Sequence, residues 1–141
     1  MRIVFIDGMG GGLVAQVISQ AAGRLPADTE LIGLGTNALA TAAMLKAGLK
    51  RVATGENAVC VTAQTADIIV GPIGIAIADA LMGEISPAMA NAVASSNAYR
   101  VLIPMNLCST YVAGVDKKSS AILDDAMAHI RSLLEGMENK P

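Results

Sequence analysis

Aromatic residues are almost absent from this chain of 141 residues: Phe, Tyr and Trp make up 2% of it, and Trp does not occur. Charged residues are also few, at 16%, and the net charge is −2 with the basic residues scattered. Proteins that bind nucleic acids use clustered basic side chains and stack aromatic rings on the bases. The composition therefore predicts no nucleic-acid partner.

Cysteine and histidine are equally scarce. Cys60 and Cys108 lie far apart in the sequence, and His129 is the one histidine. Because zinc sites and disulfide frameworks require more of these residues at closer spacing, we expect no metal site and a reducing, cytoplasmic location. His129 is expected to be a partly buried structural residue beside the apolar face of the last helix.

Long apolar runs are missing as well. The longest, residues 68–78, lies between Asp67 and Asp79 and contains two Gly and one Pro, so it is too short and too interrupted to cross a bilayer. The apolar start of the chain is interrupted by Asp7 after a few residues, which is unlike a signal peptide. We therefore expect no membrane partner.

Aliphatic residues, by contrast, are abundant. Hydrophobic residues make up 53% of the sequence, with eight Met. This length and composition predict a single domain over residues 1–141. So much apolar surface on a small domain also predicts a homo-oligomer, with the interface on the weakly charged helices within residues 75–96. Burial of those helices inside the same chain is the alternative.

Strand and helix patterns alternate along the chain. Strands are expected over residues 2–6, 30–34, 68–70 and 101–105, and helices over 13–22, 36–44, 58–64, 75–82, 86–96 and 120–135. Residues 111–115 follow a short loop and are expected to form a fifth strand, antiparallel to its neighbour. The predicted fold class is an α/β three-layer sandwich, Rossmann-like or flavodoxin-like. Its mostly parallel sheet would have about five strands and an antiparallel edge hairpin.

The turn after the first strand is rich in glycine. Gly8, Met9, Gly10, Gly11 and Gly12 lead directly into an amphipathic helix. Helix N-termini reached through glycines expose backbone N–H groups and the positive end of the helix dipole. The turn is therefore predicted to bind a small anionic ligand. The alternative is that the glycines only permit a tight turn and close packing.

Two other turns are expected at the same edge of the sheet, because right-handed crossovers bring the carboxyl ends of parallel strands together. Thr36 and Asn37 follow the second strand and would contact a sugar or a second phosphate. Gly71, Pro72 and Gly74 follow the third predicted strand and would close the pocket.

The kind of ligand is only partly specified. The glycines match several dinucleotide fingerprints in part, but the second predicted strand ends in Gly35, Thr36 and Asn37, where those sites carry an acid for the ribose. NAD is therefore not favoured. No lysine of a Walker A loop follows the glycines. The leading hypothesis is the binding of a nucleotide or phosphorylated metabolite.

Asp7, Asn106 and Cys108 are candidate catalytic residues at the same predicted edge. Asp7 could hold Mg²⁺, bond a ribose hydroxyl or act as a base, but it could also be a turn aspartate that bonds backbone N–H groups. Cys108 has no histidine nearby in sequence to activate it. The alternatives to a binding protein are thus a small oligomeric enzyme acting on a phosphorylated substrate and a ligand-free subunit of a larger assembly.

The combination of five short motifs resembles a family of small bacterial proteins of unknown function. These motifs are Ile-Asp-Gly-Met-Gly-Gly-Gly at residues 6–12, Leu-Gly-Thr-Asn-Ala at 34–38, Thr-Gly-Glu-Asn-Ala at 54–58, Gly-Pro-Ile-Gly at 71–74 and Leu-Ile-Pro-Met-Asn at 102–106. The resemblance covers nearly the whole chain and implies a free-standing protein. It implies no activity and no catalytic residue.

Overall fold

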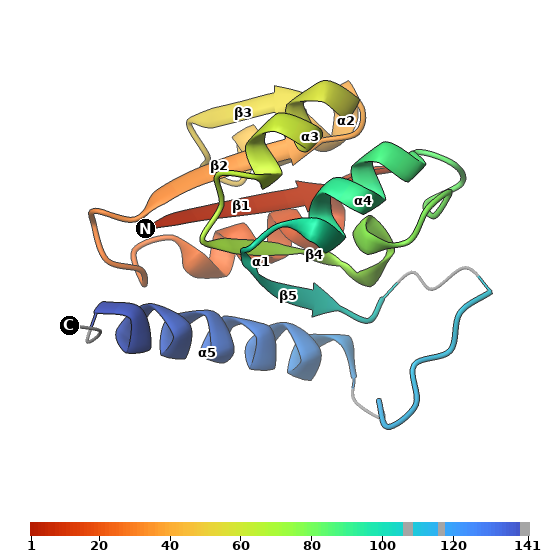
Figure 1. The fold of residues 1–141 in the computed structure, drawn as a ribbon. Coiled ribbons are helices and arrows are strands. Elements are labelled where there is room, and N and C mark those ends of the chain that lie inside the picture. Colours follow the sequence, from red (N-terminus) through yellow and green to blue (C-terminus); the bar gives the residue numbers. More distant parts are fainter. Residues whose placement is uncertain (106–108, 116–117, 139–141) are drawn as a thin grey trace.

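The computed structural model describes residues 1–105, 109–115 and 118–138 (Figure 1). Its five strands are β1 (Arg2–Asp7), β2 (Glu30–Gly35), β3 (Arg51–Thr54), β4 (Ile68–Pro72) and β5 (Tyr99–Ile103). Its helices are α1 (Gly12–Ala21), α2 (Ala38–Lys46), α3 (Glu56–Ala63), the 3₁₀ turn η1 (Ile73–Ala76), α4 (Pro87–Ser95) and α5 (Ser119–Glu138). Strands and helices alternate, as the sequence predicts.

The strands form one sheet in the order β3-β2-β1-β4-β5, and every pairing in it is parallel. The chain therefore moves outward from β1 to β3, then returns to the other side of β1 and moves outward again to β5. The order reverses between β1 and β4, which are neighbours in the centre of the sheet. In open parallel sheets, ligands bind outside the carboxyl ends of the strands at this reversal point.

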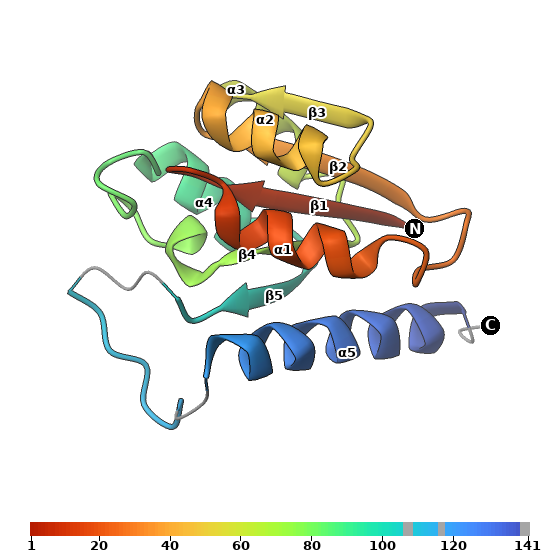
Figure 2. The ribbon, with the colours of Figure 1, turned by 180° about the vertical axis from the view of Figure 1, so that it is seen from behind.

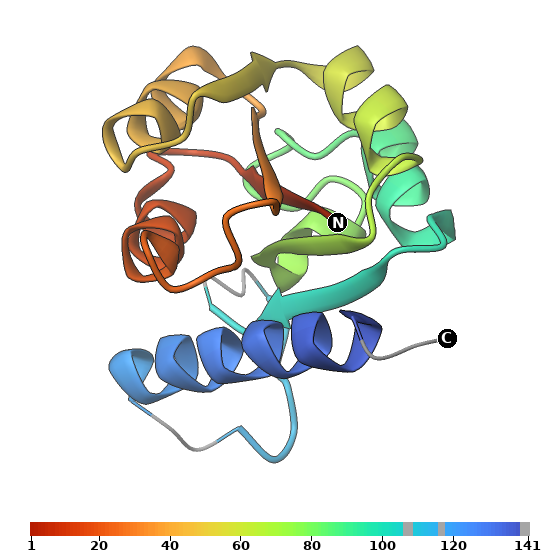
Figure 3. The ribbon, with the colours of Figure 1, turned by 90° about the vertical axis from the view of Figure 1, so that its left-hand side faces the viewer.

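Helices cover both faces of the sheet (Figure 3). Successive side chains of β1 point to opposite faces of the sheet and so join two different cores. The side chains of Ile3 and Phe5 join the core beneath α1 and α5, whereas Val4 and Ile6 join the core beneath α3 and α4. All four side chains are fully buried. Because a strand buried on both faces must be apolar at every position, the continuous apolar run of β1 specifies a central strand.

Side-chain caps fix the starts of two helices. The Asn37 side chain accepts a hydrogen bond from the N–H of Ala40 at the start of α2. Ser86 accepts one from the N–H of Met89 at the start of α4, where Pro87 occupies the first turn. Such caps satisfy amides that have no partner inside the helix. The helices expected over 36–44 and 86–96 are thus present and begin within two residues of the expected starts.

The sequence missed one strand, and two predicted elements are wrong. The missed strand is β3 at residues 51–54, a short and largely exposed edge strand that lacks the apolar pattern of the others. The helix expected over 75–82 is replaced by η1 and successive turns, in which Asp79, Leu81 and Met82 have positive φ angles incompatible with a helix. Residues 111–115 form a turn flanked by irregular chain, so no antiparallel strand is present there, and β5 pairs in parallel with β4.

Several of the large apolar side chains of segment 75–96 are buried inside the chain, whereas Ile77 and Met82 are exposed. Ile75, Ile85, Met89 and Val93 are at most 2% exposed and pack with α3 and the sheet. For these four residues the structure has the alternative given above, burial inside the same chain. The formation of a homo-oligomer stays a prediction.

The two described ends of the chain lie on the same side of the molecule. The strands run from the edge near Met1 toward the carboxyl edge, and α5 runs back in the opposite direction (Figures 1 and 2). Among the described helices, none is both long and apolar enough to span a bilayer.

Candidate functional site

The turn from β1 to α1 is tightly closed. The N–H of Gly11 donates to the carbonyl of Gly8 at 3.0 Å, and Gly11 adopts a φ of 72°. A Cβ at Gly11 would lie 2.8 Å from the Cα of Ala40. Gly11 therefore allows both the left-handed backbone and the close approach of α1 to α2.

Asp7 is 4% exposed, and both of its carboxylate oxygens accept backbone hydrogen bonds. Oδ1 accepts from the N–H of Gly8 at 2.8 Å, and Oδ2 accepts from the N–H of Val14 in the first turn of α1 at 3.0 Å. Burial raises the pKa of Asp7; these two bonds offset part of the rise, and the charge of Glu84 adds to it. These contacts match one of the alternatives given for Asp7 by the sequence, a turn aspartate that bonds backbone N–H groups.

Glu84, in the loop between η1 and α4, is the residue of the site that the sequence did not indicate. Its carboxylate accepts from the N–H of Met9, from Thr36 Oγ1 at 3.0 Å and from Asn37 Nδ2 at 2.8 Å. Burial would raise the pKa of Glu84, but these hydrogen bonds lower it overall. An ionised Glu84 thus joins the turn after β1 to the end of β2.

These contacts reduce the number of backbone amides in the turn that could bind an anion. The amides of Gly8, Met9 and Gly11 already have partners within the protein. In the part of the chain that the structure describes, no acceptor pairs with the N–H of Gly10 or Gly12. Both residues line an open cleft of about 510 Å³, together with Asp7, Gly8, Met9, Gly11, Leu13, Gln16 and Met105.

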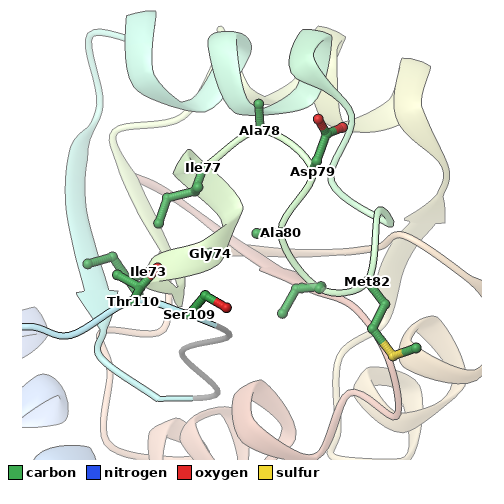
Figure 4. Close-up of a pocket in the computed structure, with 10 residues that line it drawn as sticks. Ile73, Gly74, Ile77, Ala78, Asp79, Ala80, Met82, Ser109 and Thr110 are labelled. Carbon is green, nitrogen blue, oxygen red and sulfur yellow. The ribbon is translucent and has the colours of Figure 1, made fainter.

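The Gly-Pro-Ile-Gly turn does not face this cleft. Gly71 and Pro72 are buried, and a Cβ at Gly71 would press against Ile6 of β1. Gly74 lines a separate cavity of about 330 Å³ with the loop of residues 77–82, Ser109 and Thr110 (Figure 4). The buried side chain of Leu81 contacts the positions of both Gly8 and Gly74 and so lies between the two turns.

The remaining predicted residues differ in outcome. Thr36 and Asn37 lie beside the glycine turn as predicted, because β2 pairs with β1 and the N–H of Thr36 donates to the carbonyl of Asp7 at 3.0 Å. Asn106 and Cys108 lie outside the described residues. His129 is exposed rather than partly buried, and its Nε2 lies 3.2 Å from the hydroxyl of Tyr99.

One sequence feature of Glu84 could have drawn attention to it, although its meaning is clear only from the structure. Glu84 is the sole charged residue between Asp79 and Arg100. A lone charge in an otherwise apolar segment requires either solvent or polar partners. Its partners lie 47 to 75 positions away along the chain, so local patterns could not identify them.

A parallel sheet in this order, with a glycine-rich turn at the reversal point, defines a Rossmann-like α/β protein. The model of one family, Domain of unknown function (DUF3842), matches residues 2–135, so the chain belongs to that family. This confirms the resemblance to a family of unknown function. No curated protein and no solved structure matches the chain.

Proposed function

We propose that this protein binds a nucleotide or a phosphorylated metabolite in the cleft over the turn from β1 to α1. The observation that carries the proposal is the position of the Gly10 and Gly12 amides. They line the cleft beside the reversal of strand order, and they have no acceptor among the described residues.

The local electrostatics favour an anionic group at this position. Helix α1 has ten residues, and its first turn holds no acidic side chain of its own. Its dipole therefore adds to the two unpaired amides. Hydrogen bonds to a charged acceptor contribute about 1.5–3 kcal/mol each, so two such bonds give useful affinity.

The cleft has no cationic side chain among its lining residues; Asp7 is one of them, and Glu84 is hydrogen-bonded to the turn. Backbone amides therefore provide the attraction for the ligand's phosphate. A phosphate has to sit against Gly10 and Gly12, since Glu84 already occupies the amide of Met9.

A thermal-shift panel tests the proposal. The panel contains nucleotides, dinucleotides, sugar phosphates, pyrophosphate and inorganic phosphate. A ligand at 100 times its dissociation constant adds about 2.7 kcal/mol of stability. We expect at least one phosphate-bearing compound to raise the melting temperature, and a panel without any shift would refute the proposal.

Glycine substitutions locate the binding. Nothing lies within 4 Å of a Cβ added at Gly10 or Gly12, so Gly10→Val and Gly12→Val should fold while covering the amides. We expect both to abolish the shift. Gly136→Val is the matched control, because Gly136 is an equally open position in α5, outside the site. A shift that survives in both turn variants would place the ligand elsewhere.

A further inference from the structure

Strand β5 has a neighbour on one side only. It is the last strand of the sheet, and it pairs with β4 (Figure 1). The N–H of Tyr99 donates to the carbonyl of Asp67 at 2.9 Å, so every second residue from Tyr99 onward turns its backbone groups toward β4. The N–H and carbonyl groups of Arg100 and Leu102 therefore point away from the sheet. Among the described residues, no loop or side chain bonds these groups.

A groove of about 260 Å³ lies along this open edge. Its lining comprises all five residues of β5, Pro104 and one side of α5, with Ile122, Asp125, Ala126 and His129. The outward backbone groups of β5 are thus accessible along the whole length of the strand. An extended chain placed there would continue the sheet.

The two edges of the sheet differ in how they are protected. Strand edges pair with other chains unless they are short, charged or covered. At the opposite edge, β3 has four residues and begins with the exposed side chain of Arg51. In β5 the one charged side chain, Arg100, turns back to donate to the carbonyls of Ser96 and Ala98, at 2.7 Å and 3.2 Å. The edge at β5 therefore lacks the protection found at β3.

The open groups of β5 are complementary to those of a second β5. In an antiparallel pair, residues directly opposite each other exchange both of their backbone hydrogen bonds. Pairing centred on Val101 places Arg100 of each copy opposite Leu102 of the other, so all of the open groups find partners. A shift in one direction opposes the two Arg100 side chains. A shift in the other opposes Arg100 and Pro104, which has no N–H.

The side chains beside the edge also fit a second copy. In the register centred on Val101, Tyr99 lies opposite Ile103 of the other copy, and aromatic and β-branched side chains are favourable cross-strand neighbours. Tyr99 is 47% exposed and has apolar surface left to bury. An interface with two-fold symmetry must be complementary to itself. The groove meets this condition because it carries both a base, Arg100, and an acid, Asp125.

We propose that β5 is the interface of a homodimer, in which two copies pair antiparallel about Val101 and join their sheets into one. The partner is thus a second copy of this chain. This interface differs from the helices within residues 75–96, where the sequence predicted one. The proposal does not depend on the proposed function, because β5 contributes no residue to the cleft over the glycine turn.

Mass and hydrogen exchange test the proposal on the unaltered protein. Analytical ultracentrifugation over a range of concentrations should show a dimer. The amides of Arg100 and Leu102 should exchange slowly in the dimer, because pairing removes them from water. The amide of Val52 is the control, since it points outward from β3 at the opposite edge and should exchange fast at every concentration.

A charge placed in the interface should dissociate the dimer. Tyr99→Asp puts a carboxylate opposite Ile103 of the other copy, and the symmetry repeats it. Each buried carboxylate should weaken association about tenfold or more, so the dissociation constant of the dimer should rise about a hundredfold. Tyr111→Asp is the matched control. Tyr111 is 86% exposed in the chain between β5 and α5, and its replacement should leave the dissociation constant unchanged.

A proline tests the backbone pairing itself. Leu102→Pro removes an outward N–H and leaves the ladder to β4 intact, a position where edge strands tolerate proline. It should also weaken the dimer. Val52→Pro makes the same change at a half-buried, outward position of β3 and should not. Circular dichroism checks that each variant folds, and if one does not, the exchange pattern of the unaltered protein decides.

Three outcomes would overturn the proposal. The first is a protein that stays monomeric at all concentrations. The second is a dimer that persists unchanged in both Tyr99→Asp and Leu102→Pro, because its interface would then lie on another surface. The third is a monomer in which the amides of Arg100 and Leu102 already exchange slowly, because another part of the same chain would then cover the edge.

Discussion

Replacing Gly11 by Ala and replacing Gly12 by Ala should have opposite effects on the free energy of unfolding. Gly11 has a φ of 72°, and an added Cβ would lie 2.8 Å from the Cα and 2.9 Å from the carbonyl oxygen of Ala40. Gly12 has no atom within 4 Å of its added Cβ and no positive φ. The two residues are adjacent, so other differences between the variants are small.

The magnitudes follow from these two environments. A left-handed backbone at a residue with a Cβ costs about 1–2 kcal/mol. Forcing a methyl group against backbone costs about 1–3 kcal/mol more, because α2 cannot yield as a flexible side chain would. Gly11→Ala should therefore destabilise by about 2–5 kcal/mol. Gly12→Ala should be neutral or stabilise by up to about 1 kcal/mol, because it restricts the unfolded chain.

Urea unfolding followed by circular dichroism measures both values. Similar slopes for the two variants would show that the same surface is exposed on unfolding, so that the midpoints report stability. A Gly11→Ala protein within about 0.5 kcal/mol of the unaltered one would refute the close approach of α1 and α2.

Three further predictions concern single side chains. The lowered pKa of Glu84 means that its contribution to stability is present above its unfolded value of 4.5 and is lost as the pH falls through its folded pKa. The stability difference between the unaltered protein and Glu84→Gln should therefore shrink on acidification, and a pH-independent difference would contradict this. Asn37→Ala removes the cap of α2 and a donor to Glu84 and should lower the free energy of unfolding, measured in urea, by about 1–2 kcal/mol. An unchanged free energy of unfolding would argue against the cap. Ser86→Ala removes the cap of α4 and should cost about 1 kcal/mol, whereas Ser95→Ala at the exposed end of α4 should cost less; equal losses would argue against the cap.

The architecture could be predicted from sequence where each element carries its own pattern. The apolar run of β1, Asn37 before α2 and the Ser86-Pro87 pair before α4 each act over a few neighbouring residues, and the structure has the expected strand and helices there. Strand β3 could not be found in this way. Its four residues lie at the sheet edge, where three of them are exposed and burial imposes no apolar pattern.

The helix prediction for segment 75–82 was wrong for a different reason. Its apolar composition reflects burial of Ile75 and Leu81 against the sheet, but a buried loop and a buried helix need the same apolar residues. The strained φ angles that distinguish them depend on packing from distant parts of the chain. Local sequence patterns likewise could not predict the contacts of Glu84, because its three partners come from the turn after β1 and the end of β2.

The direction of α5 has a practical consequence for handling this protein. Since that helix returns toward the side where Met1 lies, an affinity tag or surface linker attached before β1 or after α5 would lie on the side where the strands begin, opposite the cleft at their carboxyl ends. If the proposed ligand binds in the cleft, protein immobilised through Met1 and protein immobilised through an extension after α5 should therefore give the same titration curve, with the glycine turn open to the flowing buffer in both orientations.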